Sequence, residues 1–207
     1  MNMRIPAATV AAGAVLVLVA GCGGADTAST SAHDMSGMSS SASATVTETT
    51  QPGATFNDAD VMFAQMMIPH HQQAVEMAEL AETRASDKEI KELAAKIKAA
   101  QDPEIQTMRG WLTTWGRPMP SGGMDGMDHG MPGMMSEDDM KKLESAKGAA
   151  FDRRFAQLMI AHHNGAIEMA RTEQQQGADP EAKKLAQTIE TAQQAEVAQL
   201  QKILERL

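Results

Sequence analysis

The stretch FAQMMIPHHQQAVEMA, residues 63–78, returns at residues 155–170 as FAQLMIAHHNGAIEMA, an offset of 92 with eleven of sixteen residues identical. The same offset relates residues outside the stretch: Asp60 with Asp152, Gln101 with Gln193, and Glu104 with Glu196. Apolar residues recur at helical spacing in two segments of each copy, so each copy predicts a pair of amphipathic helices. Because neither hairpin can bury its apolar stripe alone, we expect an all-α fold in which two repeated hairpins pack as a four-helix bundle.

Composition divides the chain into three parts. Residues 1–22 contain one positive charge at Arg4, an apolar run and the sequence Val-Ala-Gly-Cys, which is typical of a bacterial lipoprotein signal peptide with its lipobox. Cys22 would then be lipidated and anchor an extracytoplasmic protein to the cell membrane, whereas an ordinary signal peptide would be cleaved elsewhere. Residues 23–55 are rich in Ser, Thr and Ala, which predicts a disordered tether. Residues 56–207 are predicted to form the bundle: repeat one at 56–115, a Met- and Gly-rich loop at 116–135, and repeat two at 136–207.

Several residues predict where helices begin, end or bend. Ser136 precedes an acidic turn and Asp179 precedes Pro180, and both patterns are typical of helix N-termini. Breaks are predicted at Gly148 and Gly177. Proline inside a helix removes a backbone donor, so kinks, or a split of the second helix, are expected at Pro69 and Pro103.

Composition also excludes several classes of function. The formal net charge is −9 and no cluster of Lys or Arg occurs, so the chain lacks the basic surface that nucleic-acid binding needs. Its only cysteine is assigned to the lipid anchor, which leaves no disulfide and no thiolate for catalysis or metal binding. The 18 methionines far exceed ordinary usage and concentrate in a few stretches. Any metal site is therefore expected to use His, Met and carboxylates.

The main candidate metal site lies within the repeat. Met67 lies three and four residues before His70 and His71, so on a helix the three side chains project from one face. If the two first helices meet, four imidazoles and four thioethers gather, from His70, His71, Met67, Met77, His162, His163, Met159 and Met169. Imidazole and thioether together favour copper, and the thioethers favour Cu(I) over Cu(II). The alternative is core packing, which is the preferred interpretation of Met77 and Met169 taken singly.

A second group of candidate ligands lies in segments without a predicted core. The loop contains Met124, Met127, His129, Met131, Met134 and Met135, and the tether contains His33, Met35 and Met38. Packing does not explain methionines in such segments, whereas a flexible run of thioethers can wrap a Cu(I) ion with about two to four soft ligands. These residues are predicted to be auxiliary ligands, although chance in a low-complexity sequence also explains the tether cluster.

The remaining repeated residues are expected to be structural. Glu76 and Glu168 fall roughly on the opposite side of the helix from the His pair, which predicts inter-helix or surface pairing. Asp60 and Asp152 lie two turns before Met67 and Met159, so a helix cap or a hydrogen bond into the bundle is expected of them. Packing at the end of the second helix is predicted for Trp111 and Trp115.

The doubled stretch ending in His-His-x-x-Ala-x-Glu-Met-Ala, the lead-in at residues 148–152 and the segment at residues 101–112 resemble the secreted bacterial family known as domain of unknown function 305. The resemblance covers about residues 58–207. It implies a ferritin-like four-helix bundle, and a cyanobacterial member of the family acts as a periplasmic copper-binding protein in copper resistance. By that resemblance, the His and Met residues of the repeat are the candidate copper ligands. Two departures from the family pattern are Pro103 within the second helix and the replacement of Met66 by Leu158 in the second copy.

The predicted function is copper binding for buffering, resistance or delivery to a copper transporter or cuproprotein, without enzymatic activity. One alternative is a ferritin-like redox enzyme, although neither repeat has the Glu-x-x-His spacing of di-iron sites. Another is a structural envelope lipoprotein whose methionines scavenge oxidants, because methionine sulfoxide formation is reversible. The sequence leaves the oligomeric state open.

Overall fold

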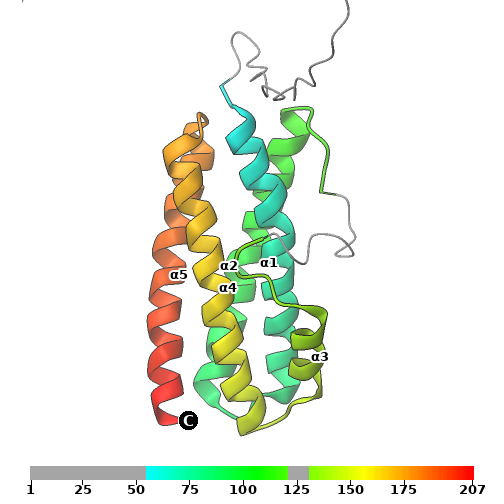
Figure 1. Ribbon diagram of the computed structural model, residues 1–207, viewed down its shortest axis with the longest axis vertical. Helices are drawn as coiled ribbons and strands as arrows, with labels where there is room; N and C mark the ends of the chain where they lie inside the picture. The colour runs from blue at the N-terminus through cyan, green and yellow to red at the C-terminus, as the bar shows by residue number, and fades with distance from the viewer. Residues whose placement is uncertain (1–54, 121–130) are drawn as a thin grey trace, which may run out of the picture. The chain divides into compact units, whose positions relative to one another are not determined.

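The computed structural model describes residues 55–120 and 131–207, and Figure 1 shows the helices within them. They are α1 (Asp58–Arg84), α2 (Lys88–Thr114), α3 (Glu137–Ser145), α4 (Ala149–Gln176) and α5 (Pro180–Arg206). The pairs α1/α2 and α4/α5 form the two repeated hairpins, and α1 packs against α4. This confirms the predicted four-helix bundle. The short α3 is an addition that precedes the second hairpin.

The described residues all belong to one unit, Val46–Leu207. The signal peptide, the lipobox with Cys22 and the tether were predicted for residues that lie outside the described ranges. None of the helices in 55–120 and 131–207 combines the length and the apolar character that a membrane span needs.

Polar side chains cap the helices close to where the sequence indicates. Asn57 begins α1 with a capping box: its side chain accepts from the Asp60 amide, and Asp60 accepts from the Asn57 amide. Ser136 caps α3, and Asp179 caps α5 ahead of Pro180 at the first helical position, as predicted. Gly148 separates α3 from α4 with a backbone φ of 60°, a conformation that favours glycine.

The two interior prolines do not divide their helices. Pro69 lies within a continuous α1 and Pro103 within a continuous α2, so the predicted split of the second helix is wrong. A proline inside a helix costs about 3 kcal/mol. Buried apolar residues on both sides of each proline, such as Ile97 and Ile105 around Pro103, keep both halves of the helix packed and offset that cost.

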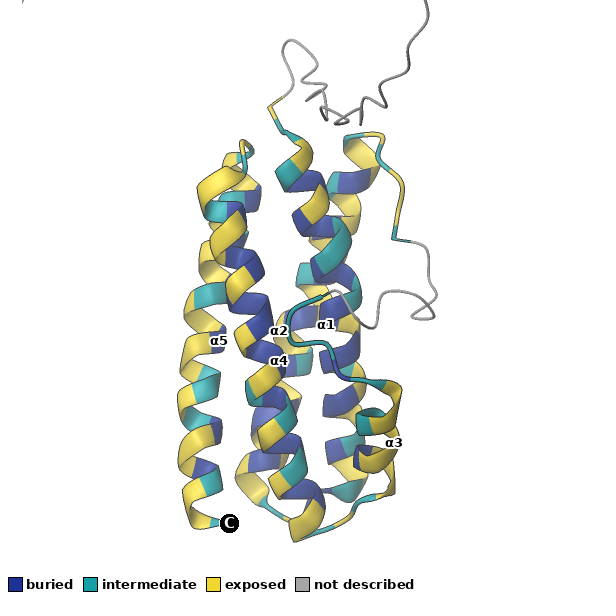
Figure 2. Cartoon of the chain, in the orientation of Figure 1, coloured by how far each residue is buried: buried dark blue, intermediate teal, exposed yellow. Residues whose placement is uncertain are grey.

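The buried apolar side chains form two clusters along the bundle, visible as dark blue bands on the facing sides of the helices in Figure 2. The α3-side cluster contains, among others, Met77, Ile97, Phe155, Met159 and Leu200. The Trp-side cluster contains, among others, Phe63, Met67, Ile105, Met108 and Ile189, with the side chains of Trp111 and Trp115 packed against it. The packing role predicted for the two tryptophans is therefore confirmed.

Two buried aspartates tie the hairpins together reciprocally. Asp60 on α1 accepts hydrogen bonds from the amides of Ala178 and Asp179 at 3.1 and 2.9 Å, in the loop before α5. Asp152 on α4 accepts from the amides of Ser86 and Asp87, both at 3.0 Å, in the loop before α2. Each hairpin thus satisfies backbone donors at the turn of the other, which confirms the hydrogen-bonding role expected of both aspartates.

Glu173 on α4 breaks this symmetry, because its counterpart in the first repeat is Ala81. Its side chain is buried, 1% exposed, and it lies against Asp60. Burial, followed by the hydrogen bond and the charge of Asp60, raises the pKa of Glu173 to about 8. Glu173 is therefore protonated in the folded protein at neutral pH and donates its proton towards Asp60.

This pair predicts a specific pH dependence of stability. Glu173 titrates near 4.5 when unfolded and near 8 when folded, so between these values the folded protein holds the extra proton. The contribution of Glu173 to the free energy of unfolding is complete below about pH 4.5 and is lost as the pH rises through about 8. We expect E173Q to remove this loss and to raise the free energy of unfolding at pH 8.5 by on the order of 2 kcal/mol relative to wild type.

Urea unfolding from about pH 5 to about pH 9 measures the free energy of unfolding of E173Q and of wild type. The histidines titrate in both proteins, so the difference between the two free energies reports Glu173 alone. E205Q changes an exposed glutamate near the C-terminus and should follow the wild-type profile. If the difference in the free energy of unfolding between E173Q and wild type stayed constant with pH, the raised pKa assigned to Glu173 would be wrong.

Candidate metal centre

A layer of buried polar side chains separates the two apolar clusters. The first repeat contributes His70, His71 and Gln101, and the second contributes the corresponding residues His162, His163 and Gln193. The four histidines are fully buried, with 0% exposure, and the two glutamines are 3% exposed. Burying this many polar groups costs free energy unless each one finds a partner. We call these six residues the polar layer.

The first histidine of each pair meets its counterpart in the middle of the bundle. The ring centroids of His70 and His162 lie 3.7 Å apart with 42° between their planes. They come from α1 and α4, as expected if the two first helices of the repeats face each other. These two residues therefore meet as the repeat predicts.

The second histidine of each pair turns towards the second helix of its own hairpin. His71 Nε2 lies 2.8 Å from Glu104 Oε2 on α2, and His163 Nε2 lies 2.8 Å from Glu196 Oε2 on α5. The two carboxylates are mostly buried, with side-chain exposures of 17% and 18%. The hydrogen bond to Glu104 fixes the tautomer of the His71 ring and leaves its Nδ1 with a free lone pair. His163 Nε2 lies at the same distance from Glu196 but does not form a hydrogen bond of good geometry with it. No role was predicted for Glu104 and Glu196, although their recurrence at the offset of 92 was a usable signal.

Several imidazole nitrogens of the layer have no hydrogen-bond partner in the described residues. They are the Nδ1 atoms of His70 and His71 and both ring nitrogens of His162 and His163. Each unpartnered buried polar atom costs about 1–3 kcal/mol. A metal ion that accepts these lone pairs would remove the cost, so the residues present fit an imidazole-ligated metal.

The protonation state of the layer suits metal binding. Burial, then the neighbouring His71, lowers the pKa of His70 to about 3, although the Pro132 carbonyl opposes this. Burial also holds the pKa of His162 well below its usual value, with the adjacent histidines adding to the effect. Both rings are therefore neutral at physiological pH, and a neutral imidazole is the form that binds a metal.

The four repeated thioethers do not gather at one point, which corrects the prediction. Met67 and Met169 belong to the Trp-side cluster, whereas Met77 and Met159 belong to the α3-side cluster. The reason is that α1 and α4 run antiparallel, so the methionine before one His pair lies beside the methionine after the other (Figure 1). Each side of the polar layer thus has one methionine from each repeat, and all four are buried.

Among residues 55–120 and 131–207, no group of three or more His, Cys, Asp or Glu side chains has the geometry of a metal site. This set of residue types excludes methionine. The layer therefore offers a pair of imidazoles, or imidazole combined with thioether, and both combinations suit copper.

A segment of the loop, residues 131–135, lies across the polar layer, and we call it the strap. In Figure 1 it runs across the bundle between α1 and α4 before α3 begins. His70 Nε2 donates to the Pro132 carbonyl at 3.1 Å. Gln73 holds the other end, donating to the Met135 carbonyl at 2.9 Å and accepting from the Met135 amide at 2.7 Å.

Gly165 makes the close approach of the strap possible. A Cβ atom at this position would meet the Pro132 carbonyl oxygen at 2.0 Å and the Gly133 Cα at 2.7 Å. Gly165 is the repeat counterpart of Gln73, so the same position in the two copies supports the strap in different ways. The two residues align in the repeat, but this role was not predicted, because no local pattern in the sequence indicates which backbone segment crosses a glycine.

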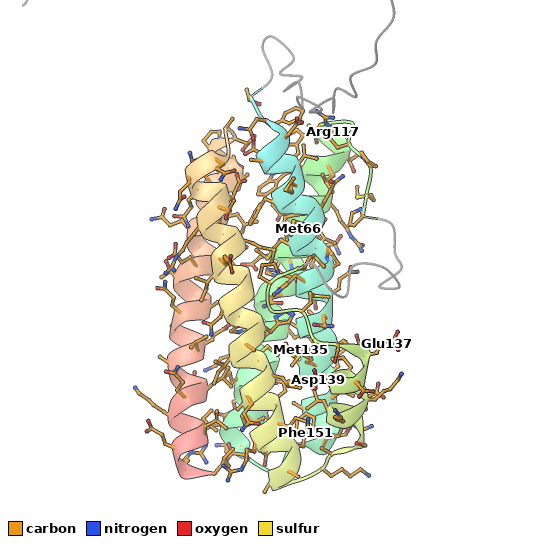
Figure 3. All side chains as sticks on the ribbon, in the orientation of Figure 1. Met66, Arg117, Met135, Glu137, Asp139 and Phe151 are labelled. Atoms are coloured by element: carbon orange, nitrogen blue, oxygen red, sulfur yellow. The ribbon has the colours of Figure 1, made fainter. Side chains whose placement is uncertain are left out.

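The loop methionines that the structure describes have different environments. Met131 and Met134 are half-buried within the strap. Met135 is 7% exposed and belongs to the α3-side cluster, close to the start of α3 in Figure 3. Packing therefore explains Met135, contrary to the expectation that this loop has no core to fill.

The remaining predicted ligands lie outside the described residues: Met124, Met127, His129, His33, Met35 and Met38. Glu76 and Glu168 are exposed, which agrees with a surface position. The predicted pairing is not seen, since neither glutamate forms an ion pair within the part of the chain that the structure covers.

Comparison with known proteins agrees with this architecture. Residues 60–204 match the family described as Domain of unknown function (DUF305). A protein from Streptomyces coelicolor described as a secreted DUF305 protein is 35% identical, with a TM-score of 0.66 over 72% of this chain and 93% of that chain. A DUF305 fragment from Deinococcus radiodurans is 32% identical, with a TM-score of 0.65 over 72% and 97%. Among curated proteins, none matches this chain.

A third similar structure is that of CopM in a Cu(I)-bound form. It is 35% identical, with a TM-score of 0.60 over 71% of this chain and 96% of that chain. CopM is also described in Cu(II)-bound and Ag-bound forms. The similarity extends over the bundle that contains the polar layer.

Proposed function

The chain belongs to the DUF305 family, and from this premise we propose that it binds copper, mainly as Cu(I), for buffering, resistance or delivery. The observation that carries the proposal is the set of unpartnered imidazole nitrogens in the polar layer. The similarity to CopM, which is described with Cu(I), Cu(II) and Ag bound, supports it independently. Copper here is the cargo that the protein holds, without a catalysed reaction.

His70 and His162 at the centre, and His71 and His163 beside them, would supply nitrogen ligands. The neutral state of His70 and His162 means that binding does not have to displace protons from these two rings near pH 7. Glu104 and Glu196 would orient the outer imidazoles. The buried thioethers on either side of the layer would favour the cuprous ion.

We place this activity outside the cytoplasm. The lipobox sequence ending at Cys22 and the secreted relative from Streptomyces coelicolor support that location. Lipidation of Cys22 would keep the protein at the membrane surface, where a copper transporter or a cuproprotein could receive the ion. The Met- and His-bearing segments before and after the first hairpin would act as auxiliary ligands, through His33, Met35, Met38, Met124, Met127, His129, Met131 and Met134.

Anaerobic Cu(I) titration against a chromophoric competitor tests the proposal. We expect the full mature chain to take Cu(I) from the competitor, and E104Q/E196Q to bind it about 10- to 100-fold more weakly, because the outer imidazoles lose their orienting carboxylates. E79Q/E205Q removes two exposed carboxylates that do not pair with the histidines, and it should bind Cu(I) as wild type does. Cu(I) binding by wild type that is no tighter than that of a variant without the four histidines and the loop would overturn the proposal.

A further inference from the structure

A cavity of about 740 Å³ opens beside the polar layer, between the first half of α1 and the second half of α4. The end of α2 closes it at one side through Trp115, and Pro132 of the strap lies at its inner end. Three methionines line it: Met62, Met66 and Met169. Figure 3 shows Met66 between α1 and α4, on the side of the strap away from α3.

The three thioethers follow a path from solvent to core. Met62 is 60% exposed, Met66 is half-buried and Met169 is 8% exposed. Met62 and Met66 lie one helical turn apart, so their side chains are neighbours on the same face of α1. Met169 approaches the same cavity from α4. Three soft sulfur donors from two helices therefore face one space.

The repeat shows that packing does not require methionine at positions 62 and 66. The counterparts of Met62 and Met66 in the second copy are Arg154 and Leu158. At that end of the bundle α3 packs against both α1 and α4, with Leu143 fully buried and Leu158 packed against the same cluster. The thioethers thus occur where the groove is open, and apolar packing occurs where α3 covers it.

The cavity also connects with the polar layer. Pro132 lines the cavity, and its carbonyl oxygen is the atom that accepts the hydrogen bond from His70 Nε2. Met169 belongs to the Trp-side cluster, which borders the layer. An ion held by the methionines would therefore lie next to the strap, on the side open to solvent.

The surrounding wall suits a soft, weakly hydrated cation. The rings of Phe56 and Trp115 stack at 4.8 Å and form an apolar side of the cavity. Arg117, which also lines the cavity, is paired with Asp58 at 3.4 Å, so the exposed carboxylate of Glu168 leaves a negative charge that attracts cations. Thioether sulfur selects Cu(I) or Ag(I) over hard ions such as Mg²⁺ and Ca²⁺.

We propose that Met62, Met66 and Met169 form a second, solvent-accessible Cu(I) site, which captures the ion before it reaches the histidines of the polar layer. The proposal rests on the copper-binding function proposed above and adds a site with its own ligands. It assigns Met169 to this cavity, so that Met67, Met77 and Met159 are the thioethers that remain beside the histidine centre.

Tryptophan fluorescence can observe this site separately. The chain has only two tryptophans; Trp115 lines the cavity and Trp111 stacks on Trp115 at 5.9 Å. We expect Ag(I), or Cu(I) under anaerobic conditions, to quench the fluorescence of the full mature chain as the second equivalent per protein is added, after the tighter histidine site has filled. In M62L/M66L the quenching should need at least about tenfold more metal, because two of the three sulfur ligands are lost. Leucine keeps the apolar volume, so the fold is preserved.

M119L is the matched control, because Met119 is also exposed, at 43%, but does not line the cavity. It should titrate as wild type does. H70L/H162L should lose the tight binding seen with the competitor and retain the fluorescence response. Tight competitor-detected binding without a fluorescence change, or equal quenching in M62L/M66L and wild type, would refute the cavity site alone. Absence of Cu(I) binding in both assays would refute the proposed function together with it.

Discussion

Replacing His70 and His162 by leucine is expected to weaken Cu(I) binding by at least about 100-fold without destabilising the metal-free protein. Loss of two central ligands should exceed the 10- to 100-fold effect that is typical of outer partners. In the metal-free state the leucines remove three imidazole nitrogens that lack hydrogen-bond partners. Leucine at position 70 also removes the hydrogen bond to the Pro132 carbonyl, which offsets part of this gain, so the free energy of unfolding should stay within about 1 kcal/mol of the wild-type value. Competitor titration and urea unfolding measure the two quantities.

Q101L provides the control within the same layer. Gln101 is 3% exposed, and neither atom of its side-chain amide has a hydrogen-bond partner. The Q101L variant should gain stability, because leucine removes two buried polar atoms without hydrogen-bond partners. Its Cu(I) affinity should stay close to that of wild type, because an amide is a poor ligand for a soft ion. A loss of more than about 2 kcal/mol in metal-free H70L/H162L would show that the histidine pair stabilises the fold, contrary to the proposal.

Substituting Gly165 by alanine is expected to destabilise the protein by about 3 kcal/mol, the largest stability effect that we predict for one methyl group. The new Cβ would lie 2.0 Å from the Pro132 oxygen and 2.4 Å from the Pro132 carbonyl carbon, and both are backbone atoms that a rotamer change cannot move. The strap must shift, which breaks the bond from His70 to Pro132 and strains the paired bonds between Gln73 and Met135. Urea unfolding measures the loss, and hydrogen exchange at the Met135 amide reports the release of the strap.

G110A is the matched substitution at an open position. A Cβ atom at Gly110 would meet nothing within 4 Å, and the residue lies inside α2. Alanine there should stabilise the protein by about 0.5–1 kcal/mol, because it has the higher helix propensity. If G165A unfolded within about 0.5 kcal/mol of wild type, the strap could not be packed against α4 as closely as the structure indicates.

The agreement between sequence and structure is best for features that depend on nearby residues. The caps at Ser136 and Asp179 and the break at Gly148 follow from side chains within one turn of the helix end, and all three are confirmed. The contact between His70 and His162 could be predicted with one further assumption, that the first helices of the two copies face each other.

Two features were beyond local patterns. Glu104 and Glu196 recur in the repeat, but only the packing of α2 on α1 and of α5 on α4 shows that they contact histidines. The continuity of α2 through Pro103 depends on buried residues on both sides of the proline, so a rule based on proline alone predicted the wrong outcome.

The sequence by itself determined two amphipathic hairpins, their helix ends and a set of soft and imidazole donors, because periodicity, capping and ligand chemistry are properties of residues close together in the chain. Only the tertiary structure decided which donors share a space. Because α1 and α4 pack antiparallel, Met67 and Met159 lie in different apolar clusters. Met67 shares its cluster with Met169, and Met159 shares its cluster with Met77. The position of α3 at one end left the equivalent groove at the other end open, because a single short helix can cover only one of two symmetric surfaces.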